Sequence, residues 1–179
     1  MPGMDRRSLA AALFDRSHLT GHFVLRSGQV SNEYFDKYRF EADPTLLRAL
    51  AEALAELVPE GTEVLAGLEL GGVPLAVALG QVTGLPCAFV RKAAKPYGTR
   101  KVAEGSDVDG RRVLVVEDVI TSGGQVVAST EDLRLLGAEV DHALCVIDRQ
   151  AGGGDALAAI GVALRPLFTM TALKSAAGR

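Results

Sequence analysis

Several features that would restrict the function of this chain are rare or absent in its 179 residues. Aromatic residues make up only 5% of the chain against 48% hydrophobic residues, so we expect a core of aliphatic side chains. No apolar run approaches the length of a bilayer span, and the first 20 residues lack the apolar centre of a signal peptide. The formal net charge of -3 provides no excess of positive charge to attract nucleic acid or a membrane surface.

Cysteine and histidine are also scarce. Cys87 and Cys145 both fall in expected strands, where a free thiol usually acts as a small buried hydrophobe. Two such cysteines form neither a disulfide framework nor a metal-ligand pattern, which is typical of a protein from the reducing cytoplasm. The three histidines belong to no cluster. No G-x-G-x-x-G is present, and residues 105–112 have the glycine spacing of a P-loop but Arg-Arg where Lys-Ser/Thr is needed.

The second part of the chain alternates between apolar runs and helical patterns. We expect strands near residues 64–68, 87–90, 113–116, 140–147 and 162–168, helices at 73–82, 125–136 and 155–160, and a loop at 92–110. This alternation predicts an α/β fold, with a mainly parallel sheet flanked by helices on both faces and ligands at the carboxyl ends of the strands.

The first 60 residues have a different pattern. Residues 6–16 carry apolar side chains at helical spacing up to Gly21, and residues 23–40 read as a hairpin with its turn near Gly28. Asp43 and Pro44 begin a helix with a leucine stripe that ends before Pro59. We therefore expect one domain over residues 1–179, in which residues 1–60 (helix, hairpin and packing helix) cover an α/β core at 61–170.

The stretch R-R-V-L-V-V-E-D-V-I-T-S-G-G-Q, residues 111–125, organises this core. Val113–Val116 read as a strand buried on both faces, and the strand ends on two acids, Glu117 and Asp118. A turn of hydroxyl and glycine residues follows, in which the hydroxyls are expected to cap the next helix. Helix N-termini of this kind bind phosphate groups. The acids are better suited to sugar hydroxyls or to a developing positive charge, so the stretch as a whole fits a sugar phosphate.

The segment V-V-E-D-V-I-T-S-G-G resembles the phosphoribosyl-diphosphate (PRPP) signature of type I phosphoribosyltransferases. The ordinary alternative is a strand, turn and helix whose acids are merely solvated at the strand end. Two more loops fit the resemblance. Glu69-Leu70-Gly71-Gly72 corresponds to the loop that contacts pyrophosphate in that family. The basic segment R-K-A-A-K-P-Y-G-T-R-K, residues 91–101, is suited to close over a leaving pyrophosphate, although basic runs are often only solvated surface.

Further motifs narrow the resemblance to the orotate phosphoribosyltransferases. They are R-K-x-x-K-x-[HY]-G in the basic segment, F-x-L-x-S-G followed by Y-F in the hairpin, and D-R-Q at residues 148–150. Three positions depart from the pattern. Arg26 replaces a frequent lysine, Tyr97 replaces a frequent histidine, and Arg100 stands where glycine is expected. Without a histidine at position 97, Lys95 becomes the candidate for assisting the leaving group.

The resemblance implies transfer of a 5-phosphoribosyl group from PRPP to orotate, with Mg²⁺ held mainly by substrate oxygens and no protein metal ligands. It gives Lys95, Glu117 and Asp118 catalytic roles. It implies PRPP contacts for Leu70, Gly71, Arg91, Lys92, Lys95, Tyr97, Glu117, Asp118, Val119, Ile120, Thr121, Ser122, Gly123, Gly124 and Gln125. It implies orotate contacts for Arg26, Tyr34, Phe35, Thr121 and Arg149.

The resemblance also implies a homodimer in which the basic segment crosses to the neighbouring site. Two alternatives remain. One is a phosphoribosyltransferase for another base, which would share the PRPP signature but not the hairpin motif or the basic segment. The other is a regulator that senses PRPP and binds nucleic acid. Such a regulator would need a basic N-terminal module, whereas acids outnumber basic residues in the first 60 positions.

Overall fold

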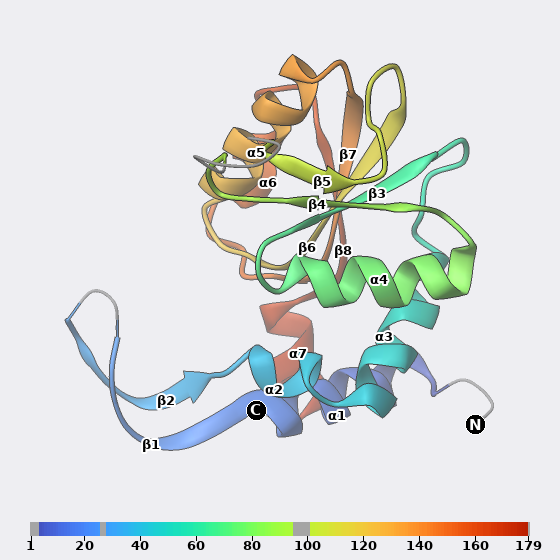
Figure 1. The fold of residues 1–179 in the computed structure, drawn as a ribbon. Helices are drawn as coiled ribbons and strands as arrows, with labels where there is room; N and C mark the ends of the chain where they lie inside the picture. Colours follow the sequence, from blue (N-terminus) through green and yellow to red (C-terminus); the bar gives the residue numbers. More distant parts are fainter. Residues whose placement is uncertain (1–3, 26–27, 95–100, 179) are drawn as a thin grey trace.

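The structure, a computed structural model, describes residues 4–25, 28–94 and 101–178 (Figure 1). Its main sheet has the strand order β5-β4-β3-β6-β7-β8. Neighbouring strands are parallel except for β4 and β5, which are antiparallel. The strands are β3 (Val64–Leu68), β4 (Cys87–Val90), β5 (Ala103–Gly105), β6 (Arg112–Ile120), β7 (Glu139–Asp148) and β8 (Ala163–Thr169). The expected mainly parallel sheet is therefore confirmed.

The order of the strands creates a switch point in the middle of the sheet. The chain passes from β3 through α4 (Gly72–Thr83) to β4 on one side, and from β6 through α5 (Gly124–Leu135) to β7 on the other. A short helix, α6 (Gly153–Ala158), leads from β7 to β8. Where neighbouring strands send their connections in opposite directions, a crevice opens at their carboxyl ends. In this sheet the loops that follow β3 and β6 flank that point, so they are where a ligand is expected to bind.

Two hydrophobic clusters cover the two faces of the sheet, as the sequence predicts. Leu75 and Leu79 of α4 pack with Leu114 of β6 on one face. On the opposite face, Leu133 of α5 packs with Val115 of β6. Consecutive residues of β6 thus point to opposite clusters, which explains why its apolar run has no polar interruption.

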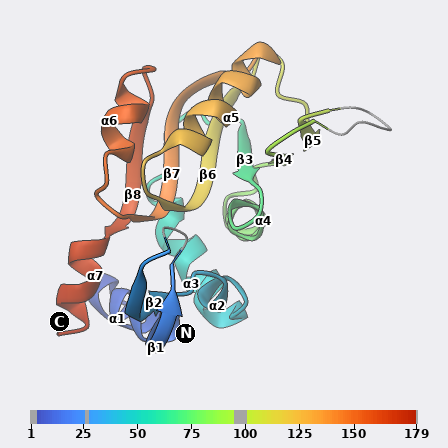
Figure 2. The same ribbon diagram turned by 90° about the vertical axis from the view of Figure 1, so that its left-hand side faces the viewer.

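The remaining elements form a helical layer and a hairpin beyond α4 (Figures 1 and 2). They are α1 (Arg6–Ser17), β1 (His18–Val24), β2 (Val30–Phe35), α2 (Tyr38–Glu41), α3 (Pro44–Ala55) and α7 (Met170–Ala176). We call α1, β1, β2 and α2 together the hood. In Figure 1 the hairpin of β1 and β2 projects sideways from the helical layer. Among the described residues, no helix is long and apolar enough to cross a membrane.

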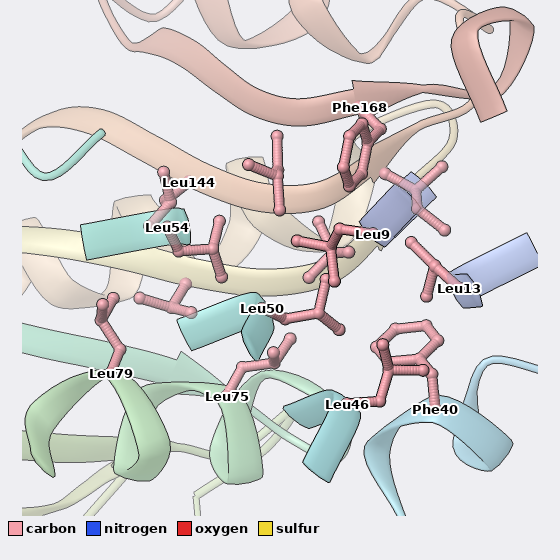
Figure 3. Close-up of a cluster of buried hydrophobic side chains, with 14 of the residues drawn as sticks. Leu9, Leu13, Phe40, Leu46, Leu50, Leu54, Leu75, Leu79, Leu144 and Phe168 are labelled. Carbon is pink, nitrogen blue, oxygen red and sulfur yellow. The ribbon is translucent and has the colours of Figure 1, made fainter. Parts of the chain in front are cut away.

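A cluster of leucines joins the helical layer to the sheet (Figure 3). Its fully buried members include Leu13 of α1, Phe40 of α2 and Leu50 of α3. The leucine stripe of α3 is buried as expected, and Asp43 caps the helix by accepting hydrogen bonds from the N–H groups of Thr45 and Leu46. Burial of one such side chain contributes roughly 1.5–3 kcal/mol, so this layer is firmly attached.

Some element boundaries differ from the sequence expectation. Helix α1 ends at Ser17, and the hairpin spans residues 18–35 where 23–40 was expected. His18 pairs with Phe35, and the Asp36 N–H donates to the Ser17 carbonyl at 2.9 Å, so the chain turns into α2 directly after β2. Strand β5 lies inside the expected loop at 92–110 because three residues are too few to show a periodicity. Helix α7 was not expected.

Candidate active site

Four segments that the sequence singles out meet at one edge of the sheet. Because β4, β3, β6 and β7 are parallel, their carboxyl ends share that edge. The segments that follow them are Arg91–Lys92, Glu69–Gly72, Thr121–Gln125 and Arg149. The Arg149 N–H donates to the Ile120 carbonyl at 2.9 Å, which places Arg149 next to the start of the turn that follows β6.

The turn from Thr121 to Gly124 leaves the N-terminus of α5 open. The helix begins at Gly124, and its N-cap is Gly123, with φ of 79° and no side-chain cap. The expected hydroxyl cap is therefore wrong, because Thr121 and Ser122 precede a left-handed glycine that takes the cap position itself. Thr121, Ser122 and Gly124 are exposed. An open helix N-terminus beside exposed hydroxyls is suited to bind a phosphate.

The remaining residues of this segment have different surroundings. The Gln125 side chain is exposed, and its Nε2 donates to Ser129 Oγ at 3.1 Å, within the first turn of α5. Val119 is half-buried and Ile120 is buried, since both still belong to β6. Strand β6 thus extends two residues beyond the acids, so any contact of Val119 or Ile120 with a ligand would come from the backbone.

The acid pair is buried. Glu117 is 8% exposed and Asp118 is completely buried, so the reading of these acids as solvated at a strand end is wrong. Asp118 Oδ2 lies 2.6 Å from Lys37 Nζ, and the Glu41 carboxyl lies beside the same group, both facing the Cβ position of Gly71. Both partners come from the hood side, Lys37 directly before α2 and Glu41 within it. Burial of acids without full pairing is costly, which makes this cluster a candidate for function.

The charges in the cluster are unequal. Burial raises the pKa of Glu41 to about 9, and the hydrogen bond and charge of Asp118 act in the same direction. Burial and the adjacent Asp118 charge raise the pKa of Glu117 to about 8. Burial opposes ionisation of Asp118 too, but its hydrogen bonds with Glu41 and Lys37 prevail and lower its pKa. In the substrate-free protein at neutral pH, Asp118 is therefore the ionised acid and Lys37 its counter-ion.

The loop from Glu69 to Gly72 rests on this cluster. A Cβ atom at Gly71 would overlap the Asp118 carboxyl and would lie 2.5 Å from Glu41 Oε1. Only glycine therefore fits at position 71, for a reason of packing that the glycine pair itself does not reveal. Leu70 is 65% exposed and points away from the core.

The basic segment is described in part. Arg91 is half-buried, and its N–H donates to the Val102 carbonyl at 2.8 Å, while Lys92 is exposed. The Lys92 N–H donates to Glu69 Oε1, which links the basic segment to the preceding loop. Lys95, Tyr97 and Arg100 lie outside the described residues, as does Arg26 of the hairpin.

A cavity of about 270 Å³ separates the hairpin from the sheet edge. It brings together three residues expected at the base site, Tyr34, Phe35 and Arg149. Phe14, His18 and Lys174 also line it, although the sequence does not single them out. His18 stacks on Phe14 with ring centroids 4.7 Å apart. Aromatic walls with cationic side chains suit a flat anionic ligand.

Lys37 and Glu41 are the residues that the sequence reading missed. The hairpin expected over residues 23–40 placed Lys37 in a strand and ended before Glu41, which gave no reason to aim either residue at Asp118. Their only signal in the sequence is that Lys37 closely follows the Y-F motif. Among the described residues, no group of three or more potential ligands is placed to hold a metal ion.

Known proteins resemble this chain over most of its length. Residues 39–160 match the phosphoribosyl transferase domain family. The chain is 53% identical over 169 residues to an orotate phosphoribosyltransferase from Nocardioides sp., covering 94% of each chain. It is 42% identical to one from Methanocella arvoryzae, covering 86% of this chain and 87% of that protein. The crystal structure of Mycobacterium tuberculosis orotate phosphoribosyltransferase in complex with PRPP superposes with a TM-score of 0.82 and 29% identity, covering 95% of this chain and 99% of that one.

Proposed function

This chain belongs to the orotate phosphoribosyltransferase family, and we propose that it transfers the 5-phosphoribosyl group from PRPP to N1 of orotate. The products are orotidine 5'-monophosphate and pyrophosphate, so the reaction is a step of pyrimidine synthesis toward UMP. The observation that carries the proposal is that the acid pair and the open turn lie at the same sheet edge as Arg149, which lines a cavity with aromatic walls and is hydrogen bonded to Ile120 at the end of β6. Similarity to proteins named for this activity over nearly the whole chain supports it.

The PRPP half of the site is the loop edge between β3 and β6. The open N-terminus of α5 and the exposed turn before it would bind the 5-phosphate of PRPP. Glu117 and Asp118 would accept hydrogen bonds from the ribose hydroxyls and stabilise the positive charge that develops on the ribosyl ring. A transition state with oxocarbenium character needs such charge more than it needs a strong base.

The leaving group is pyrophosphate, whose charge must be neutralised as the glycosidic bond breaks. Arg91 and Lys92 lie at the carboxyl end of β4, and the hydrogen bond from Lys92 to Glu69 keeps them beside the Leu70–Gly71 loop. We assign the cationic cover of the pyrophosphate to these residues together with Lys95, which would assist the leaving group. Tyr97 would contribute a further PRPP contact.

Orotate would occupy the cavity under the hairpin. Its flat ring would lie against Tyr34 and Phe35, and its carboxylate or carbonyls would meet Arg149 and Arg26. Thr121 follows Ile120, the hydrogen-bond partner of Arg149, so it can reach both substrates. N1 of the base would then approach the anomeric carbon from the side opposite to the pyrophosphate, which gives inversion.

Mg²⁺ is the metal that we assign to the reaction. Magnesium prefers hard oxygen ligands and often binds through substrate phosphates and water. We therefore assign the ion to the substrate side of the site, where it would be held mainly through PRPP. When bound, it would supply positive charge to the pyrophosphate.

We also propose a cytoplasmic homodimer in which the basic segment of one subunit completes the site of its partner. Cys87 and Cys145 are free thiols, in agreement with a reducing compartment. Mixing Lys95→Ala protein with Glu117→Gln protein tests the shared site. Hybrid dimers should regain activity that neither variant has alone. Additive residual activities, or a monomer by light scattering, would contradict the shared site.

The activity itself is tested by the magnesium-dependent loss of orotate absorbance on addition of PRPP. Adenine, hypoxanthine and uracil serve as competing bases, and Lys95→Ala is compared with wild type. We expect turnover of orotate alone and a large fall in kcat for the variant. Turnover of another base would support the alternative phosphoribosyltransferase. PRPP binding without any turnover would support the regulator.

A further inference from the structure

Lys37 and Glu41 contact the acid pair from outside every segment assigned to a substrate above. Lys37 Nζ lies 2.6 Å from Asp118 Oδ2, and the buried Glu41 carboxyl lies beside the same carboxyl, against Gly71. Asp118 is completely buried and Glu41 is 9% exposed, whereas the Lys37 side chain is 33% exposed. Asp118 is therefore ordered by hood residues, so the hood and the PRPP half share one hydrogen-bonded cluster.

The same segment carries the aromatic residues expected to contact the base, Tyr34 and Phe35, which we call the base wall. Lys37 follows Phe35 by two residues, and the chain between them is fixed by local hydrogen bonds. The Asp36 N–H donates to the Ser17 carbonyl at 2.9 Å, and the Tyr38 N–H donates to Asp36 Oδ1 at 3.1 Å. A shift of Lys37 away from Asp118 would thus be transmitted to Phe35, which lines the cavity.

We propose that Lys37 and Glu41 are positioning residues that couple the two halves of the site, holding the Asp118 carboxylate in place and the base wall at a fixed distance from it. The inference rests on the proposed function and deepens it. Displacement at the anomeric carbon needs the base nitrogen and the ribose in a near-attack geometry, and a displacement of about 1 Å can cost about a hundredfold in rate. The contacts of Lys37 and Glu41 with Asp118 would fix the position of the hood relative to the sheet edge and so maintain that geometry.

The charges of the cluster make the coupling specific. Two adjacent buried carboxyls repel each other when both are ionised, and the Lys37 ammonium favours the charge on Asp118 and therefore the proton on Glu41. The groups that face Asp118 are Lys37 and Glu41 from the hood and Glu117 from β6. The Tyr38 ring lies 5.3 Å from Lys37 Nζ and contributes a cation–π contact.

Replacement of Lys37 tests the proposal. Lys37→Met should lower kcat about a hundredfold, as expected for a misplaced acid and base wall. It should also move the acidic limb of the kcat/KM profile to higher pH, because loss of the ammonium raises the pKa of Asp118. Lys37→Arg should recover most of kcat and return the limb toward its wild-type position. A purely structural residue would not move this limb.

Glu41 gives a second, independent comparison. Glu41→Gln keeps a hydrogen-bond donor toward Asp118 and should retain most of the activity, whereas Glu41→Ala should lose as much as Lys37→Met. Should Lys37→Met fail to fold, this pair and Lys37→Arg decide the question. Equal activity of the Gln and Ala variants would overturn the proposal.

The matched control removes an exposed ion pair of the same kind. Arg48 Nε lies 3.0 Å from Glu52 on the outer face of α3, with the Arg48 side chain 81% exposed. Arg48→Met should leave kcat and the pH profile unchanged. Absence of orotate turnover in wild type would overturn the proposed function. Turnover in wild type with an unchanged kcat and pH profile in Lys37→Met would overturn this inference alone.

Discussion

The two halves of the site differ in how firmly the fold holds them. Every residue of β3 is buried, and in β6 six of the first seven residues are buried, since each strand has partners on both sides. In β1 and β2, by contrast, all positions are exposed or partly exposed, and the two strands pair only with each other in the described structure. The PRPP half is therefore built into the core, whereas the base half depends on a two-stranded hairpin.

This difference shows why contacts at the base of the hairpin matter. A two-stranded hairpin has little stability of its own, and regions with few buried contacts open most easily. The Lys37–Asp118 ion pair, the buried Glu41 carboxyl beside it and the Asp36–Ser17 hydrogen bond hold the hairpin end of the hood against the core. Disturbing either half should therefore have distinct and separable effects.

Gly71→Ala should have the largest effect on activity. The new methyl group would overlap the Asp118 carboxyl and meet Glu41, so the loop and the acid must separate. We expect kcat/KM to fall by about a hundredfold or more and stability to fall by about 1–3 kcal/mol. Steady-state kinetics and urea denaturation measure both quantities.

Gly154→Ala is the control for this substitution. Gly154 lies in the short helix α6, and the nearest atom to its new methyl group would be Leu164 Cδ2, at 4.0 Å. Activity and stability should stay near wild type. If Gly71→Ala behaved like Gly154→Ala, the packing of the loop on the acid pair would be wrong.

A pair of valine truncations compares the two regions in stability. Val115→Ala in β6 removes two methyl groups from a completely buried position and should cost about 2 kcal/mol. Val24→Ala in the hairpin removes them from a side chain that is 72% exposed and should change stability by no more than about 0.5 kcal/mol. Chemical denaturation distinguishes the two. Similar losses would show that the hairpin is packed more tightly than its exposure indicates.

A pair of arginine substitutions compares the two regions in substrate binding. Arg149→Met should raise KM for orotate about tenfold, because a charged hydrogen bond worth roughly 1.5–3 kcal/mol is lost, and should leave PRPP binding unchanged. Arg91→Met should do the reverse and weaken PRPP binding alone. Calorimetry for PRPP and initial rates for orotate provide the constants. Parallel changes in both constants for both variants would refute the division into halves.

The last comparison is a pH dependence of the substrate-free protein. Folding raises the pKa of Glu117 from 4.5 to about 8 and that of Glu41 to about 9, chiefly through burial. Between these values the folded state binds more protons than the unfolded state, so the contribution of both groups falls as pH rises from about 4.5 to 9. Asp118 has a lowered pKa, so its contribution is lost only in acid.

Denaturant unfolding between pH 5 and 9 measures this dependence. Wild type should lose stability across the window, and Glu41→Gln, which cannot ionise, should lose less. The same slope in both proteins would show that Glu41 does not hold a proton in the folded state.

Part of this structure follows from local sequence. The apolar run Val113–Val116 gives a buried strand because both of its faces need apolar residues, and the glycines that follow Thr121 and Ser122 give a tight turn into α5, although the hydroxyl cap expected there is absent. The leucine stripe of α3 likewise follows from helical periodicity. Each feature depends on residues within a few positions of one another, so spacing alone predicts it.

Tertiary structure decided the surroundings of the acids. Asp118 lies against Lys37 and Glu41, residues about 80 positions away, because α2 packs at the sheet edge where β6 ends. The need for glycine at position 71 has the same origin, since the obstacle is the carboxyl of another strand. Spacing within the sequence carries no record of such contacts. They depend on how whole layers pack. This packing buries Glu117 and Asp118, which the sequence places at a strand end, and brings Lys37 to balance the charge of Asp118.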